Sequence, residues 1–127
     1  MLQDRPLHST IPAADLERAK AFYEEKLGFT GGDRSPGGIF YDCAGGTRLL
    51  LYPTPGAGTG QHTLAGWAVD DIESAVAELR ERGVVFEEYD FPGLKTVNGI
   101  ADTGPVRAAW FKDSEGNILG IVQLPGA

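Results

Sequence analysis

The sequence predicts an α+β fold made of two β-α-β-β-β modules whose strands form a curved mixed sheet around a cavity. Three observations predict it: each half contains an amphipathic helix, one strand precedes each helix, and several strands follow it. A loop rich in proline and glycine, residues 53–60, lies between the halves. We therefore expect a single domain over 1–127, with one module at about 6–52, a linker at 53–61 and a second module at about 62–125.

The first half begins with a short strand, Leu7 to Ile11, that we expect to stop at Pro12. Asp15 is the expected N-cap of a helix that ends at Gly28, which can adopt the left-handed conformation. The apolar side chains of this helix follow helical spacing: Leu16, Ala19, Phe22, Tyr23 and Leu27. Strands are predicted around Phe29, at 39–43 and at 48–52, with a hairpin turn at 44–47.

The second half repeats this order, which indicates an internal duplication. A strand is predicted at 64–69, and Asp70 with Glu73 has the spacing of a capping box. The helix that follows ends at Gly83 and has an apolar stripe of Ile72, Ala75, Val76 and Leu79. Strands are predicted at 84–89, 95–101, 106–112 and 118–124, the last one after a turn at 113–117. Alignment of the helices matches Asp15-Leu16-Glu17 with Asp71-Ile72-Glu73, and Tyr23 with Leu79.

Charge and composition argue against several classes of function. The chain has 11 basic and 18 acidic residues, a net charge of −7, which disfavours binding to nucleic acid or to anionic membranes. No apolar segment has the length of a signal peptide core or a membrane span. The lone cysteine, Cys43, excludes an intramolecular disulfide and is expected to be structural rather than nucleophilic. We expect a cytoplasmic protein.

Three segments then carry a family pattern. Residues 11–29 contain Asp15-Leu16, then Phe22-Tyr23, and close on Leu27-Gly28-Phe29. Residues 67–72 and 110–117 supply the matching segments of the second half, with Ser114 where the pattern has proline. The chain therefore resembles the vicinal oxygen chelate superfamily, which comprises glyoxalases, bleomycin-resistance proteins and extradiol dioxygenases. The resemblance extends from Leu7 to Leu124 and implies the same fold.

The resemblance also implies four metal-ligand positions, one on each of four strands. They fall at His8, at about Leu49 with Leu51 on the same face, at Leu64 and at Gly120. Only His8 can coordinate a metal ion through its side chain. If a bulge shifted the register, His8 and His62 could form a site of two histidines, but the last strand offers no third ligand. We expect no cofactor, with a divalent metal ion on His8 and His62 as the alternative.

Removal of the ligating side chains would leave an apolar pocket. Thr96 and Asn98 alternate with Val97, so both could point into the pocket, or they could belong to a solvated edge strand with an Asn-Gly turn. Gly66 could widen the pocket or allow close backbone packing. Trp110 and Phe111 point to opposite faces, and the sequence leaves open which of them faces the pocket. The expected pocket residues are His8, Thr10, Leu49, Leu51, Leu64, Gly66, Thr96, Asn98, Gly120 and Val122.

The expected function is metal-independent binding of a small apolar or aromatic molecule, as the resemblance to the bleomycin-resistance branch implies. The resemblance also implies a homodimer. Two enzymatic alternatives stay open. One is a metal-dependent lyase, isomerase or dioxygenase that uses His8 and His62, and the other is a cofactor-free enzyme with His8 as its base.

Overall fold

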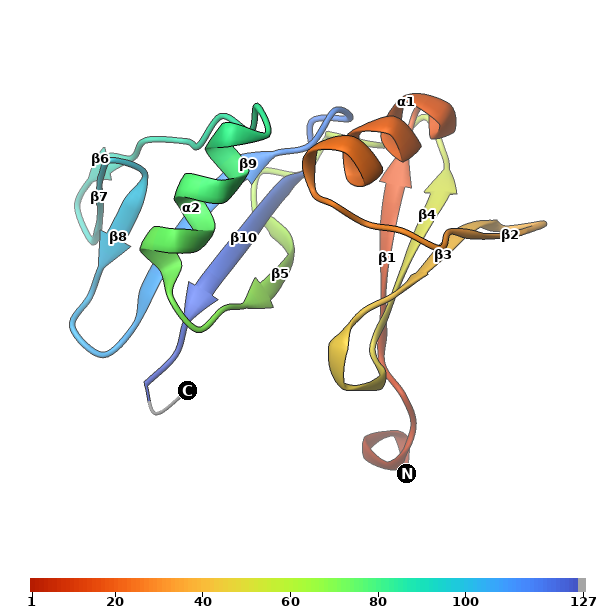
Figure 1. Cartoon of the computed structure of the whole chain (residues 1–127), viewed down its shortest axis with the longest axis horizontal. Coiled ribbons are helices and arrows are strands. Elements are labelled where there is room, and N and C mark those ends of the chain that lie inside the picture. The colour runs from red at the N-terminus through yellow and green to blue at the C-terminus, as the bar shows by residue number, and fades with distance from the viewer. Residues whose placement is uncertain (126–127) are drawn as a thin grey trace.

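The computed structural model describes residues 1–125 and contains two modules, each with a helix against one side of a sheet (Figure 1). This confirms the predicted α+β fold of two β-α-β-β-β modules, with the strands arranged in two mixed sheets. A short 3₁₀ turn, η1 (Leu2–Asp4), precedes the first module. Among residues 1–125, no helix has both the length and the apolar character that a membrane crossing requires.

The first module has a four-stranded sheet in the order β1-β4-β3-β2, with β1 parallel to β4. Its helix α1 continues directly into a π-helical turn, η2, before Gly28 ends it with a φ of +80°. The elements are β1 (His8–Ala13), α1 (Leu16–Ala21), η2 (Phe22–Lys26), β2 (Asp33–Ser35), β3 (Gly38–Asp42), the 3₁₀ turn η3 (Ala44–Gly46) and β4 (Arg48–Pro53).

The second module has the same core plan and adds two short strands at its far edge. Its sheet has the order β5-β10-β9-β8-β7-β6, with β5 parallel to β10. The elements are β5 (Thr63–Ala68), α2 (Ile72–Glu81), β6 (Asp90–Phe91), β7 (Leu94–Val97), β8 (Ile100–Asp102), β9 (Arg107–Lys112) and β10 (Ile118–Gln123).

Several predicted boundaries are wrong for identifiable reasons. Strand β1 runs through Pro12 to Ala13, because β1 lies at the edge of its sheet, where a missing N–H is tolerated. The N-cap of α2 is Asp71 rather than Asp70, since the Asp71 carboxylate accepts the N–H groups of Glu73 and Ser74. No strand forms around Phe29. The segment 84–89 pairs only through an isolated bridge at Phe86, and the segment 95–101 is a hairpin of β7 and β8.

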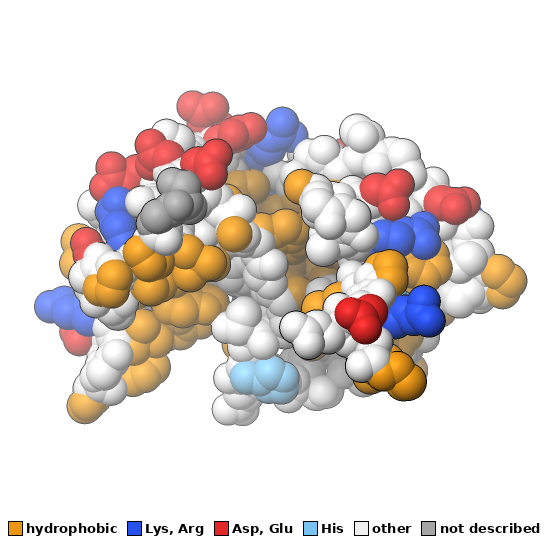
Figure 2. All heavy atoms as spheres, turned by 90° about the horizontal axis from the view of Figure 1, so that it is seen from below, with side chains coloured by type: hydrophobic (Ala, Val, Ile, Leu, Met, Phe, Trp, Pro, Cys, Tyr) orange, Lys and Arg blue, Asp and Glu red, His pale blue; other side chains and the backbone are white. Residues whose placement is uncertain are grey.

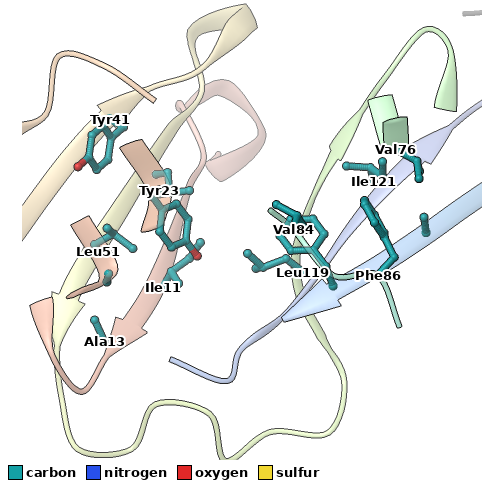
Figure 3. Close-up of a cluster of buried hydrophobic side chains, with 14 of the residues drawn as sticks. Ile11, Ala13, Tyr23, Tyr41, Leu51, Val76, Val84, Phe86, Leu119 and Ile121 are labelled. Carbon is teal, nitrogen blue, oxygen red and sulfur yellow. The ribbon is translucent and has the colours of Figure 1, made fainter. Parts of the chain in front are cut away.

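The core lies between each sheet and its helix. Figure 3 shows the labelled side chains in two groups, one from each module. Ile11, Tyr23 and Leu51 belong to the first group, and Phe86 and Leu119 to the second. Phe29 and Trp67 connect the two groups, with their ring centroids 6.0 Å apart.

The turn 113–117, between β9 and β10, joins the second module to the first through hydrogen bonds. Buried Tyr23 donates its hydroxyl to the Asp113 carboxylate at 2.7 Å, and Asn117 donates to the carbonyl of Pro12 at 2.8 Å. Asn117 also accepts the N–H of Gly58, in the linker, at 3.1 Å. We call this set of contacts across the modules the latch.

Glu115 completes the latch at the start of α1. Its carboxylate accepts the backbone N–H of Asp15 at 2.8 Å and two bonds from the Arg18 guanidinium at 2.8 and 3.0 Å. The hydrogen bond from Arg18 is the main reason that the pKa of Glu115 falls to about 2. The carboxylate is thus ionised over the whole neutral range.

Candidate binding site on the open face

Each sheet has one face against its helix and one face that points away from it, which we call the open face. Because strand side chains alternate, neighbouring residues of β9 point to opposite faces. Phe111 is 1% exposed and packs in the core, so Trp110 is the aromatic residue on the open face. Seen from below, the outline of the molecule is notched beside the second module, and hydrophobic side chains line one wall of the notch (Figure 2).

An aromatic wall stands on the open face of the second module. Tyr89 precedes β6, Phe91 lies in β6, and their rings are 6.0 Å apart. The ring of Tyr89 lies edge-on to Trp110 at 5.7 Å. Leu94 and Ile118 extend this apolar surface. We use the name aromatic wall for Tyr89, Phe91 and Trp110.

The aromatic wall borders a hollow of about 400 Å³. Its polar lining consists of Gln61, His62, Thr63, Glu87 and Lys112. Lys112 and Glu87 face each other at 3.6 Å, so the charges at the rim compensate each other. Burial is the main cause of the raised pKa of Tyr89, whose hydroxyl therefore stays protonated at neutral pH.

Close packing explains why two predicted pocket positions are glycines. The indole of Trp110 lies against Gly120, where a Cβ atom would come within 3.3 Å of Trp110 Cδ1. The space beside Gly120 is therefore filled by Trp110, and the expectation that it enlarges the pocket is wrong. A Cβ on Gly66 would lie 3.0 Å from the carbonyl oxygen of Gly120, which favours the close-packing interpretation of Gly66.

Leu49 and Leu51 do not face the hollow at the aromatic wall. They are 2% and 0% exposed and pack in the core against the helix, so the placement of Leu51 in the pocket is wrong. Leu49 instead borders, together with the predicted Gly66, a separate hollow of about 190 Å³. The open face of β4 instead carries Arg48, Leu50 and Tyr52. The difference is one residue of register, and a shift of one residue turns every side chain of a strand to the other face.

Leu64 lies at an irregularity in the pairing of β5 with β10. Thr63 pairs with Ile118 and Ala65 with Leu119, so Leu64 is an extra residue without a partner. Leu64 and His62 both line a smaller hollow of about 180 Å³ beside the linker. His62 also lines the hollow at the aromatic wall, which makes it the histidine that the two hollows share.

Thr96 and Asn98 make other contacts than those expected of pocket residues. The Thr96 hydroxyl donates to Glu88 at 2.6 Å and accepts the N–H of Tyr89 at 2.8 Å, so both of its roles are used within the second module. Asn98 forms the two-residue turn between β7 and β8 with Gly99, both at positive φ. Asn98 lines a hollow beside α2, on the helix side of the sheet, so its placement in the pocket is wrong and the alternative prediction of an Asn-Gly turn is confirmed.

The first module has a different open face. His8 and Thr10 are exposed at the start of β1, and the imidazole of His8 lies edge-on to Phe40 at 5.9 Å. The guanidinium of Arg48 lies over the same Phe40 ring at 4.1 Å and is held by Asp42 at 3.2 Å. Val122, the last predicted pocket residue, is half-buried in β10, where it pairs with Ala68 and Ala108.

Sequence reasoning missed Tyr89, Phe91 and Leu94. The prediction ends a strand at Tyr89 and names only Thr96 and Asn98 from the segment that follows, although Tyr89 and Phe91 are two residues apart, a spacing that places side chains of an extended chain on one side. The partner of this pair is Trp110, which comes from another strand. Its proximity depends on the strand order and could not be inferred from spacing.

A comparison with known protein families agrees with this fold of two modules. The model of the glyoxalase/bleomycin resistance protein/dioxygenase superfamily matches residues 5–121. The chain belongs to this superfamily. It is 31% identical over 131 residues to YurT of Bacillus subtilis (strain 168), an uncharacterized protein, and the match covers 91% of this chain and 95% of YurT.

Solved structures of other superfamily members share the fold. TnmS3, an antibiotic binding protein from Streptomyces sp. CB03234, is 25% identical with a TM-score of 0.65, and the match covers 98% of each chain. A putative glyoxalase family protein from Bacillus anthracis is 18% identical with a TM-score of 0.70, over 95% of each chain. The second match shows the fold alone.

A divalent metal ion needs several ligands in one place, and the residues at the four implied positions do not supply them. Among residues 1–125, no three His, Cys, Asp or Glu side chains come together in a group that could hold a metal ion. The nearest charged neighbour of His8 across the strand pair is Arg48, a cation. At the last of the four positions, Trp110 covers Gly120.

Proposed function

We propose that this superfamily member binds a small neutral or cationic aromatic molecule at the aromatic wall, without a metal ion, and sequesters or carries it. The observation that carries the proposal is the set of rings Tyr89, Phe91 and Trp110 around one hollow. Aromatic pairs in such edge-to-face or offset arrangements contribute about 0.5–1.5 kcal/mol each beyond the area that they bury. An aromatic ring of the ligand can pack against the ring faces that the aromatic wall leaves uncovered.

The size and charge of the hollow support this class of ligand. Its volume of about 400 Å³ lies toward the small end of the range found for small-molecule sites. The net charge of −7 disfavours an anion, and Lys112 is already paired with Glu87. The relationship to TnmS3, which is described as antibiotic binding, supports an organic ligand over an inorganic one.

We also propose that the protein forms a homodimer, as the resemblance to the superfamily implies. Large apolar side chains on or near the open faces support this, because Phe91 is 53% and Leu64 is 39% exposed. A second copy that covered the open face would bury these side chains and close the hollow. Light scattering coupled to size exclusion measures the mass, and a monomer at all micromolar concentrations would contradict this part of the proposal.

Titration with 1-aminoanthracene, a neutral probe that fluoresces more strongly in an apolar site, tests the binding site. Phe91 is more than half exposed, so Phe91→Ala should fold normally and weaken binding about tenfold, which corresponds to about 1.4 kcal/mol. Val85→Ala is the matched control, because Val85 is an exposed apolar residue outside the hollow. Equal affinity of the wild type and Phe91→Ala would show that the aromatic wall is not the site.

A further inference from the structure

We propose a second binding site, on the helix side of the molecule where the two modules meet, that takes a small aromatic or short-chain carboxylate. This site would lie on the opposite side of the second sheet from the aromatic wall. Phe111 and Ile121 line it, whereas Trp110 and Ile118 line the hollow at the aromatic wall. The proposal therefore does not depend on the function proposed above.

An apolar hollow would hold the body of the ligand. Its volume is about 190 Å³, and every residue that lines it is apolar: Leu27, Phe29, Trp67, Val69, Leu79, Phe111 and Ile121. An apolar cavity of about 150 Å³ is enough to bind benzene, so this hollow suits one ring with a short substituent. Leu27 and Phe29 come from the first module and the others from the second, so neither module forms the hollow alone.

Two cations lie close to residues that neighbour the hollow in the chain, one from the end of each helix. The guanidinium Nη1 of Arg82, at the end of α2, is 3.5 Å from the position that a Cβ atom of Gly28 would occupy. Gly28 lies between Leu27 and Phe29, both of which line the hollow. In return, Lys26 Nζ at the end of η2 is 3.7 Å from the equivalent position on Gly83. Each helix thus places its last cation over the terminal glycine of the other helix.

Neither cation is held by a close carboxylate. Lys26 has no carboxylate within 4.0 Å among the described residues and lies over the Phe22 ring at 5.6 Å, and the ion pair of Arg82 with Glu78 is long, at 4.0 Å. Both cations also offset the negative ends of the two helix dipoles, a role that alone would account for their presence. What points to a ligand is the combination of two cations with a hollow whose lining residues are all apolar. A carboxylate with an apolar body matches both parts.

NMR titration with sodium phenylacetate tests the proposal, with 2-phenylethanol as the neutral probe of similar shape. We expect saturable shifts of the methyl signals of Leu27, Val69, Leu79 and Ile121, and affinity for phenylacetate at least about fivefold higher than for the alcohol. The double variant Lys26→Gln, Arg82→Gln removes two exposed charges and should abolish that preference. Lys20→Gln is the matched control, since Lys20 lies on α1 and pairs with Glu24 instead.

Three results would overturn the proposal. The first is the absence of saturable methyl shifts up to about 10 mM phenylacetate, a range that detects millimolar dissociation constants. The second is equal affinity for the acid and the alcohol in the wild type. The third is loss of these shifts as the protein concentration and the measured mass rise together, which would show that a second copy covers the hollow.

Discussion

The corresponding turns of the two modules have the same backbone closure but different side chains. In the second module, the N–H of Asp113 donates to the carbonyl of Asn117, and in the first, the N–H of Cys43 donates to the carbonyl of Thr47. Asp113, Glu115 and Asn117 all bond to the first module, whereas the side chain of Thr47 bonds only within its own turn. The two turns thus share a backbone hydrogen bond but differ in what their side chains contact.

The helices show the same asymmetry. Both begin with an aspartate N-cap, Asp15 or Asp71, and both end at a glycine of positive φ. Tyr23 of the first helix reaches the latch, but its counterpart in the alignment is Leu79, which has no hydroxyl and lines the apolar hollow. The turn 113–117 of the second module therefore holds the first module in place. The repeat pattern of the sequence does not predict this difference between the modules.

The largest expected effect comes from removing the Tyr23 hydroxyl. Tyr23→Phe should lower the free energy of unfolding by about 2 kcal/mol, because a hydrogen bond to a charged group contributes about 1.5–3 kcal/mol. Tyr41→Phe is a matched control, since both tyrosines are fully buried but Tyr41 bonds to the partly exposed Glu24. We expect a loss of about 1 kcal/mol or less there. Equal losses in urea denaturation would mean that the Tyr23–Asp113 hydrogen bond of the latch stabilises the fold no more than the Tyr41–Glu24 hydrogen bond does.

A smaller effect concerns the dependence of stability on pH. Because the pKa of Glu115 in the folded protein is about 2, below its ordinary value of 4.5, the ionised carboxylate stabilises the fold above pH 4.5. This contribution should decline as pH falls from about 4.5 toward 2. Glu115→Gln should make the urea midpoint fall less steeply with pH over that interval, and the exposed Glu81→Gln should leave the wild-type slope unchanged. A wild-type slope in Glu115→Gln would contradict the role of Glu115.

The smallest effect is expected on the open face of the first module. His8 is exposed and lies edge-on to Phe40, so His8→Ala should change the free energy of unfolding by less than about 0.5 kcal/mol. Chelation with EDTA should leave the melting temperature unchanged in both the wild type and the variant. Stoichiometric metal in the purified protein that is lost in His8→Ala would contradict this and favour the metal-dependent enzyme.

The repeat pattern made the modules predictable because it depends on local rules. An aspartate before each apolar helical stripe and a glycine after it determine where each helix starts and ends, and neither needs the rest of the chain. The three family segments then indicated how the modules are built. The errors at Pro12 and Asp71 are errors of one or two residues at element ends, where neighbouring aspartates or an edge strand decide the boundary.

The candidate site was less predictable because it depends on register and strand order. Leu49 and Leu51 point to the helix side of the sheet, one residue away from the predicted register. Trp110 meets Tyr89 because the segment 84–89, which follows α2, runs beside β9. The sequence by itself determined two capped helices, a duplicated plan and a shortage of metal ligands, since these follow from residue type and local spacing. Only the tertiary structure decided which faces are open, how Trp110 fills the space over Gly120 and how the turn 113–117 holds the first module, because those contacts join residues that are distant in the chain.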